Sequence, residues 1–195
     1  MPNEALIALA TLAAYLLGSV PFAVIVSRAF KLADPRTYGS KNPGATNVLR
    51  SGNKKAAALT LLGDALKGWL AVFLAQHYQL SNLAIGLVAL AVFFGHLYPI
   101  FLRFKGGKGV ATAAGVLFGL NLVLGLGVIG VWIAVALISR YSSLAAVCAA
   151  ASAPLLTGML VGSSGGILPV VSVLSAALIA KHWQNIQRLM AGQES

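Results

Sequence analysis

Long apolar stretches separated by short polar segments form the main pattern of this chain. Residues 5–26, 83–102 and 144–161 consist mostly of aliphatic and aromatic side chains. Each stretch has roughly the 20 residues that an α-helix needs to cross a hydrocarbon core of about 30 Å. No basic segment precedes the first stretch, so we expect a retained first helix rather than a cleaved signal peptide. The pattern predicts an all-α polytopic membrane protein.

The stretch of residues 110–139 determines the number of helices. Its 30 residues are too many for one ordinary span and too few for two comfortable ones. We favour a helical hairpin that turns near residues 119–121 and has one short limb, about 110–119, which neighbouring helices must shield. With further helices at about 56–76, 142–161 and 166–188, the prediction is seven transmembrane helices in a single domain of residues 1–195.

The basic residues orient these helices. Cytoplasmic loops of membrane proteins carry an excess of lysine and arginine. With the loop of residues 31–55 inside, the hairpin also brings Arg140, Lys181 and Arg188 to the inside, and Lys67 is the base that lies deep in a span. The prediction is therefore an N-terminus outside and a cytoplasmic C-terminus, with the basic loops facing the cytoplasm.

Charge and composition narrow the function. The chain is 58% hydrophobic and has 14 lysines and arginines but only four acids, for a net charge of +10. A nucleic-acid-binding protein would show a basic stripe interleaved with aromatic residues, and this sequence shows none. We therefore expect an anionic substrate held beside lipid. The few acids exclude a paired-carboxylate hydrolase, and no cluster has metal-ligand or Ser-His-Asp spacing, so we expect neither metal nor cofactor. Asp64 and Lys67 are three residues apart within a span, which predicts a structural ion pair.

The first candidate anion site is the polar loop of residues 39–50. Gly39 and Gly44 can adopt positive φ, which lets backbone N–H groups face an anion. Side-chain donors in the same loop are Ser40, Asn42, Thr46, Asn47 and Arg50. Ala45 stands where a nucleotide P-loop needs lysine, which argues against a triphosphate. A loop of ordinary turn-forming residues would explain the same composition.

The second candidate site combines residues 95–99 with residues 104–109. Two cations, Lys105 and Lys108, flank Gly106 and Gly107, which places point charges and accessible backbone at one spot. A positive-inside anchor explains the lysines but not the glycines, which cost order unless the backbone approaches something closely. His96 precedes this string, and a histidine at a helix end is more often a packing residue than a ligand.

The third candidate site combines residues 140–143 with residues 181–188. His182 and Asn185 are three residues apart, which places them on one face of the last helix. Snorkelling side chains at a helix end explain Lys181 and Arg188 but not Asn185.

The chain resembles the bacterial acyl-phosphate:glycerol-3-phosphate acyltransferase (PlsY) family along essentially its whole length. The motifs that carry the resemblance are Leu17-Gly18-Ser19-Val20-Pro21-Phe22, Gly39-Ser40-x-Asn42-x-Gly44-Ala45-Thr46-Asn47-x-x-Arg50, Gly95-His96-x-Tyr98-Pro99-x-Phe101, Phe104-Lys105-Gly106-Gly107-Lys108-Gly109-Val110-Ala111-Thr112 and His182-x-x-Asn185. The resemblance implies a seven-helix inner-membrane enzyme of phospholipid synthesis. It implies transfer of a fatty acyl group from acyl phosphate, rather than acyl-CoA, to the 1-hydroxyl of sn-glycerol 3-phosphate, giving lysophosphatidate and phosphate.

By position, the resemblance implies a role for each motif. Ser40 and Arg50 correspond to the essential pair of the first motif, and His182 and Asn185 to the pair of the third motif. The string around Gly106 and Gly107 corresponds to the glycerol-phosphate loop.

The chain departs from the family at two positions. Gln184 stands where the family usually has a glutamate that is thought structural. Ala146 stands where the family often has a second serine, and if that serine binds phosphate, Ser142 or Ser143 would have to compensate.

The implied mechanism is direct attack of the glycerol hydroxyl on an already activated acyl group, with cations and amides stabilising the developing charge. A phosphate oxygen of the donor and His182 are the rival proton acceptors. The acyl chain would lie between helices and enter from the membrane lipid, and a soluble enzyme that makes acyl phosphate could dock. The main alternative function is a carrier of organic phosphates. Inverted repeats would favour a carrier, and this sequence shows none. A structural anchor is a distant third.

Overall fold

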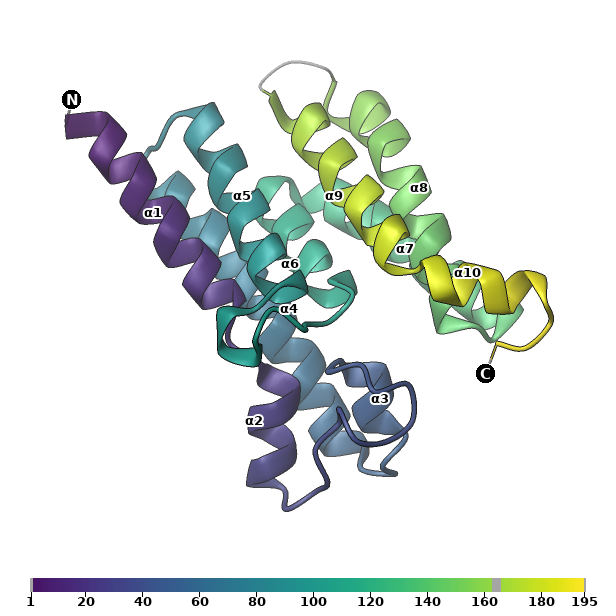
Figure 1. Ribbon diagram of the computed structural model, residues 1–195. Helices are drawn as coiled ribbons and strands as arrows, with labels where there is room; N and C mark the ends of the chain where they lie inside the picture. The colour runs from purple at the N-terminus through teal and green to yellow at the C-terminus, as the bar shows by residue number, and fades with distance from the viewer. Residues whose placement is uncertain (1, 163–165, 195) are drawn as a thin grey trace. The chain divides into compact units, whose positions relative to one another are not determined.

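The computed structural model describes residues 2–162 and 166–194, and within them the regular secondary structure is helical (Figure 1). The prediction of an all-α protein is confirmed. The elements in chain order are α1 (Pro2–Gly18), α2 (Phe22–Ala29), α3 (Ala45–Leu49), α4 (Lys54–His77), α5 (Asn82–Leu97), the 3₁₀ turn η1 (Ile100–Leu102), α6 (Val110–Leu120), α7 (Leu122–Ser139), α8 (Ser142–Leu160), α9 (Ile167–Lys181) and α10 (Trp183–Met190).

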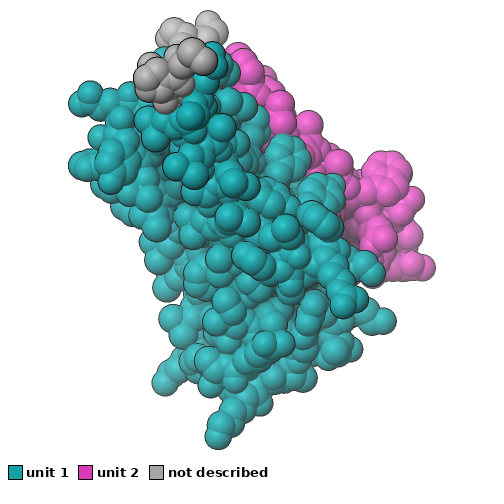
Figure 2. All heavy atoms as spheres, turned by 60° about the vertical axis from the view of Figure 1, so that its left-hand side comes forward, with its two compact units in different colours: residues 1–116 teal, residues 117–195 magenta. Residues whose placement is uncertain are grey.

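The chain forms two compact units, residues 1–116 and residues 117–195, which Figure 2 shows in separate colours. In the first unit α1 packs along α5, and α4 contacts α1, α2, α3 and α5. In the second unit α7, α8 and α9 pack in sequence, and α10 contacts α8 and α9. The predicted single-domain organisation remains a prediction.

Within the described part of the chain, four helical segments are long and apolar enough to cross a membrane: 54–77, 82–102, 122–139 and 142–160. The number rises to six if the bent pairs α1 with α2 and α9 with α10 each form one span, and α6 is a shorter apolar helix. Large apolar side chains face outward, among them Ile138 and Met159 at 85% and 81% exposed. Helices that are apolar all round and yet exposed fit a lipid environment. The predicted count of seven spans and the predicted orientation of the termini remain predictions.

The first span is broken, whereas the sequence predicted one continuous helix over residues 5–26. Helix α1 ends at Gly18, α2 begins at Phe22, and the two axes differ by 42°. Pro21 has no N–H to donate, and it disfavours helical backbone at Val20. Gly18 also packs against the backbone of Val92 so closely that a Cβ there would collide with it. Hydrophobic length indicated a span but not this interruption.

Side chains from other segments satisfy the backbone at this break. The Lys67 Nζ donates a hydrogen bond to the Val20 carbonyl at 2.9 Å. The Ser19 hydroxyl donates to the Tyr15 carbonyl at 2.9 Å and accepts from the Ile100 N–H at 3.4 Å. An unpaired backbone group inside a bilayer costs several kcal/mol. These bonds therefore fix the break against α4 and against the segment that follows α5.

The last predicted helix, 166–188, is also broken, and α9 and α10 meet at His182 with a 57° bend. The Leu178 carbonyl accepts hydrogen bonds from both the His182 backbone N–H at 3.2 Å and its Nδ1 at 2.8 Å. A side chain that enters the backbone ladder is a known cause of sharp kinks. His182 and Asn185 thus lie at a bend rather than on one straight helix, and both side chains are buried.

The turn predicted near residues 119–121 is present. Helix α6 ends at Leu120, and Asn121 caps α7 by accepting a hydrogen bond from the Leu124 N–H at 2.9 Å. Gly115 and Gly68 let the backbones of α6 and α4 approach closely, because a Cβ on either glycine would collide with the carbonyl of the other helix. Helix α4 thus provides shielding for the short limb, as its length required.

Cysteine labelling will test the predicted orientation. In a Cys148→Ala background, a cysteine at Gln79, in the exposed loop after α4, should react with an impermeant maleimide added to sealed cells. Cysteines at Thr37, Arg140 or Gln193, which are also exposed, should react only after the cells are opened. Reaction of the Gln193 cysteine in sealed cells would contradict the predicted hairpin of residues 110–139 and the cytoplasmic C-terminus that follows from it.

Candidate functional site

Asn47 sets the shape of the polar loop that precedes α4. Its Nδ2 donates hydrogen bonds to the Pro35 carbonyl at 2.6 Å and to the Tyr38 carbonyl at 3.2 Å. Its Oδ1 accepts from the Ser40 N–H at 3.0 Å. The side chain is 2% exposed. Asn47, predicted as a substrate donor, commits both amide hydrogens to the loop and so holds its shape, and a contact with a ligand remains a prediction.

Only one of the two loop glycines predicted to adopt positive φ does so. Gly39 has φ of +55°, whereas Gly44 has φ of −142° in extended backbone and precedes α3. The second left-handed residue of the loop is Lys41, at φ of +56°. The prediction for Gly44 was wrong because the chain straightens there to enter a helix. The backbone curl that could face an anion lies at residues 39–41.

Ser40 and Arg50 lie together at this curl. Ser40 is held by its N–H on Asn47, and a Cβ added at Gly39 would contact the Arg50 Cδ at 3.2 Å. Ser40, Thr46 and Arg50 are exposed, and Asn42 is half-buried. The Arg50 side chain thus passes beside the curl at residues 39–40, ten residues earlier in the chain, as the first candidate site requires.

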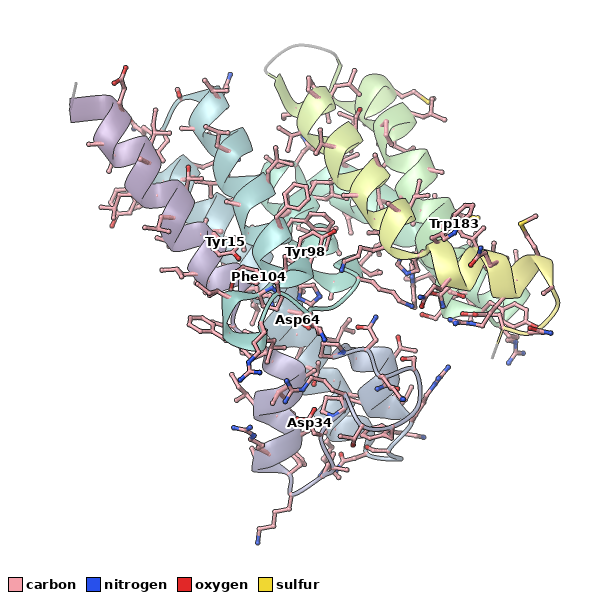
Figure 3. All side chains as sticks on the ribbon, in the orientation of Figure 1. Tyr15, Asp34, Asp64, Tyr98, Phe104 and Trp183 are labelled. Atoms are coloured by element: carbon pink, nitrogen blue, oxygen red, sulfur yellow. The ribbon has the colours of Figure 1, made fainter. Side chains whose placement is uncertain are left out.

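The neighbouring acid of the loop is committed to a different base. Asp34 and Arg36 form a salt bridge at 2.6 Å, and the Arg36 Nε also donates to Asp34 at 2.9 Å (Asp34 is labelled in Figure 3). Hydrogen bonds from the Arg36 side chain hold the pKa of Asp34 below its usual value. This pair braces the start of the loop, and the salt bridge of Asp34 is with Arg36 rather than with Arg50.

Close packing explains the glycines of the second candidate site. A Cβ at Gly106 would collide with the His96 carbonyl and with Pro99, and a Cβ at Gly107 would collide with the His96 imidazole. The Gly107 N–H donates to the His96 carbonyl at 3.2 Å. Neither glycine is among the positive-φ residues, whereas the following Gly109 has φ of +86°. The prediction that the backbone approaches something closely is confirmed, and its partner is His96.

Lys105 and Lys108 flank this contact. Lys105 is exposed, Lys108 is half-buried, and Gly107 between them is buried. His96 itself contacts Asp64, with its Nδ1 at 3.4 Å from the carboxylate. Asp64 forms the predicted ion pair with Lys67 at 2.7 Å. The first unit therefore joins the string of residues 105–108 to two charged groups buried in α4.

His182 and Asn185 form a buried pair in the second unit, with side chains 3% and 5% exposed. Because the Leu178 carbonyl can only accept, the His182 Nδ1 carries the hydrogen of their 2.8 Å bond. In the neutral ring, Nε2 then holds the lone pair, which is the state a proton acceptor needs.

Glu194 is a site residue that the sequence analysis missed. Its carboxylate accepts hydrogen bonds from the Asn185 Nδ2 at 2.5 Å and from the Arg188 Nε at 2.8 Å. Gly192, at φ of +65°, turns the chain back toward α10, and the Gln193 N–H bonds the Arg188 carbonyl at 2.8 Å. A Gly shortly after a helix end was the available signal for such a turn.

The carboxylate of Glu194 is charged in its folded environment. Partial burial raises the pKa of Glu194, but hydrogen bonds from Asn185 and Arg188 outweigh it, and the net pKa lies below its ordinary value. Ser143, in the first turn of α8, also lies close enough to lower this pKa. Gln184 is exposed, so the acid that supports Asn185 comes from the tail rather than from the position between His182 and Asn185.

The predicted site residues therefore fall into three groups. Two groups lie in the first unit, around Ser40 and Arg50 and around His96 and Gly107, and one lies in the second unit, around His182 and Asn185. Ala146 is buried in α8 at 2% exposed. Among the described residues, no three His, Cys, Asp or Glu side chains gather as metal ligands.

Comparisons with known proteins give a consistent result. The family described as glycerol-3-phosphate acyltransferase matches residues 8–192. A glycerol-3-phosphate acyltransferase from Dechloromonas aromatica is 70% identical over 189 residues, which are 97% of this chain and 95% of that protein. One from Burkholderia ambifaria is 62% identical over 190 residues, 97% of this chain and 90% of that protein.

A solved structure is also similar. The crystal structure of PlsY (YgiH), an integral membrane glycerol 3-phosphate acyltransferase, in its glycerol 3-phosphate form gives a TM-score of 0.91 at 38% identity. The match covers 97% of this chain and 94% of that chain. Its lysophosphatidic acid form gives a TM-score of 0.89.

The contact of Glu194 with Asn185 and Arg188 predicts a pH-dependent contribution to stability. Because the pKa of Glu194 is lower in the folded chain than its ordinary value of 4.5, the carboxylate stabilises the fold above that pH. The contribution is lost as the pH falls through the depressed folded pKa. We expect Glu194→Gln to cost about 1–2 kcal/mol at neutral pH, after allowance for the exposure of Arg188.

Thermal unfolding in detergent at a series of pH values will measure this effect. The difference in Tm between the native chain and Glu194→Gln should be largest near neutrality and should shrink below pH 4.5. Glu4→Gln, at the exposed start of α1, is the matched control and should leave the curve unchanged. Parallel curves for the native chain and Glu194→Gln would rule out the carboxylate as the source.

Proposed function

We propose that this chain, which belongs to the glycerol-3-phosphate acyltransferase family, takes its acyl group from an acyl phosphate. The acceptor is the 1-hydroxyl of sn-glycerol 3-phosphate, and the products are lysophosphatidate and phosphate. The similarity over 97% of the chain to an enzyme known in a glycerol 3-phosphate form and a lysophosphatidic acid form carries this proposal.

The composition of the candidate sites supports an acyl phosphate as donor. The fifth residue after each of the three histidines is Asn82, Phe101 or Gln187, so the His-x4-Asp signature of soluble and peripheral acyltransferases is absent from the sequence. A mixed anhydride of a fatty acid with phosphate is already activated. It needs a site that neutralises phosphate, and cationic and amide-rich loops are suited to that.

The proposed reaction is a single displacement at the acyl carbonyl. The 1-hydroxyl oxygen of glycerol 3-phosphate attacks the carbonyl carbon, a C–O ester bond forms, and the C–O bond to phosphate breaks. The electron pair of the broken bond leaves with the phosphate. The hydroxyl proton moves either to an oxygen of the departing phosphate or to the His182 Nε2.

The described contacts suggest a division of roles among the groups. Arg50 and the curl at Ser40 would hold phosphate oxygens, since a guanidinium and backbone amides match them in geometry and charge. The string around Gly107 would receive glycerol 3-phosphate, with Lys105 and Lys108 supplying charge. Asn185, fixed by Glu194, would orient the reacting groups beside His182.

The proposed location is the bacterial inner membrane, with the loops that carry these groups on the cytoplasmic side. Glycerol 3-phosphate is a soluble anion and would arrive from the cytoplasm. The acyl chain would stay in the lipid around the outward-facing apolar side chains of the helices.

The donor is tested with purified protein. We expect lysophosphatidate to form from glycerol 3-phosphate with palmitoyl phosphate and almost none with palmitoyl-CoA at the same concentration. Comparable turnover with palmitoyl-CoA would show that the donor assignment is wrong, although the family would stand.

Kinetics of single variants will test the division of roles. Gly107→Ala should mainly raise the KM for glycerol 3-phosphate, because its methyl group would displace the His96 ring beside the loop. Arg50→Ala and His182→Ala should mainly lower kcat, each by roughly 30- to 1,000-fold, or about 2–4 kcal/mol.

Lys55→Ala is the matched control for Arg50→Ala, since Lys55 is an exposed base close to Arg50 in the sequence, in the first turn of α4. It should leave kcat nearly unchanged. A near-normal kcat for His182→Ala together with a large loss for Arg50→Ala would identify the phosphate oxygen of the donor as the proton acceptor.

A further inference from the structure

Two opposite charges are buried one turn apart in the middle of α4. The side chains of Asp64 and Lys67 are 4% and 1% exposed, and the Lys67 Nζ lies 2.7 Å from the Asp64 Oδ1 (Asp64 is labelled in Figure 3). Ionisable groups inside a span are costly and usually serve a purpose. A buried ion pair is also weak evidence for stability, because well-packed apolar residues often serve as well. The partners of this pair outside α4 indicate what it does.

Each member of the pair has a second partner. Lys67 donates to the Val20 carbonyl at 2.9 Å, at the break between α1 and α2. Asp64 lies 3.4 Å from the Nδ1 of His96, which is 8% exposed near the end of α5. The pair thus connects the broken first span to the start of the segment that holds the second candidate site.

The His96 ring lies between Asp64 and the glycine loop. With Nδ1 directed at the carboxylate, the opposite edge of the ring is directed at Gly107, where a Cβ would collide first with Nε2. The main chain repeats the contact, because the Gly107 N–H donates to the His96 carbonyl at 3.2 Å. A carboxylate 3.4 Å from one nitrogen of a histidine favours a proton on that nitrogen, and so favours one tautomer and one orientation of the ring.

We propose that Asp64 and Lys67 are positioning residues, which hold the His96 ring and through it the backbone of Gly106 and Gly107 in the shape that receives glycerol 3-phosphate. This inference rests on the proposed function, since it takes residues 105–108 as the glycerol-phosphate loop. Neither residue of the pair touches substrate. Lys67 keeps Asp64 charged and in place, and Asp64 keeps the imidazole turned toward the loop.

The alternative role is limited to the break at Val20. In that case the pair stabilises the fold, and its loss lowers stability without a selective effect on one substrate. Removing only one charge cannot separate the two roles, because it leaves the other charge buried and unpaired. The informative variant is the double substitution Asp64→Asn/Lys67→Gln, which removes both charges and keeps an amide able to donate to the Val20 carbonyl.

The kinetic test compares this double variant with the native chain in detergent. We expect the KM for glycerol 3-phosphate to rise about 10- to 100-fold, with kcat and the KM for acyl phosphate changed only slightly. Loss of a residue that orients a histidine without touching the ligand typically has an effect of this size. His96→Asn keeps a donor toward Asp64 but removes the Nε2 edge, and it should show the same selective rise.

Two further variants control the interpretation. Thr60→Val changes a fully buried polar residue of α4 whose hydroxyl donates to the Ala56 carbonyl of the same helix at 2.9 Å, and it should leave both KM values unchanged. Gly107→Ala combined with the double variant should raise the KM by less than the product of the separate effects, since both act on the contact between the ring and the loop.

A readout independent of turnover distinguishes failure of this inference from failure of the proposed function. Nitrogen NMR of ¹⁵N-histidine-labelled protein, with His96→Asn to assign the signal, should show His96 protonated at Nδ1 in the native chain and an altered tautomer in the double variant. An unchanged His96 signal, or a KM for glycerol 3-phosphate equal to that of the native chain, would overturn the inference. An inactive native chain would overturn the proposed function, and the His96 signal would still decide the positioning role.

Discussion

The hydrogen bond from Lys67 to the Val20 carbonyl is the interaction on which much of the first unit depends. A helix that breaks inside a bilayer exposes backbone groups that lipid cannot satisfy. Pro21 makes the break necessary, and a lysine from α4 makes it stable. That lysine needs a counter-charge, which Asp64 supplies, and Asp64 in turn contacts His96. The Val20 carbonyl, which also accepts a hydrogen bond from the Phe22 N–H at 3.2 Å, is thus one end of a chain of polar contacts that ends at Gly107.

Three of the four acids of this chain hold other residues in place. Asp34 braces the polar loop through Arg36, Asp64 orients a histidine from within α4, and Glu194 holds Asn185 and Arg188. Each carboxylate fixes the shape of one candidate group. Both substrates of the proposed reaction carry phosphate, and a carboxylate that faced the ligand would repel it. A carboxylate that contacts a donor on the side away from the ligand instead keeps that donor in place.

The sequence predicted those features that depend on local composition. Apolar runs indicated the spans, the polar Asn121 marked the end of the short α6, and the paired glycines indicated a close backbone approach. Features that depend on distant partners could not be predicted in this way. The amide of Asn47 appeared available to a ligand until its three loop partners were known, and nothing near Asn185 in sequence pointed to Glu194. Gly44 illustrates a third case, because its freedom to adopt positive φ did not require it to do so.

Support by a neighbour is common to the three groups of site residues. Asn47 holds the curl beside Arg50, His96 contacts the backbone of Gly107, and Glu194 holds the amide of Asn185. An activated acyl donor requires little help with bond breaking, so the larger part of the rate enhancement must come from orientation and from donors already in place. Such donors act without reorganising only if other residues fix them. The supporting residues Asn47, Asp64 and Glu194 are therefore as necessary to the proposed chemistry as the groups that would touch phosphate.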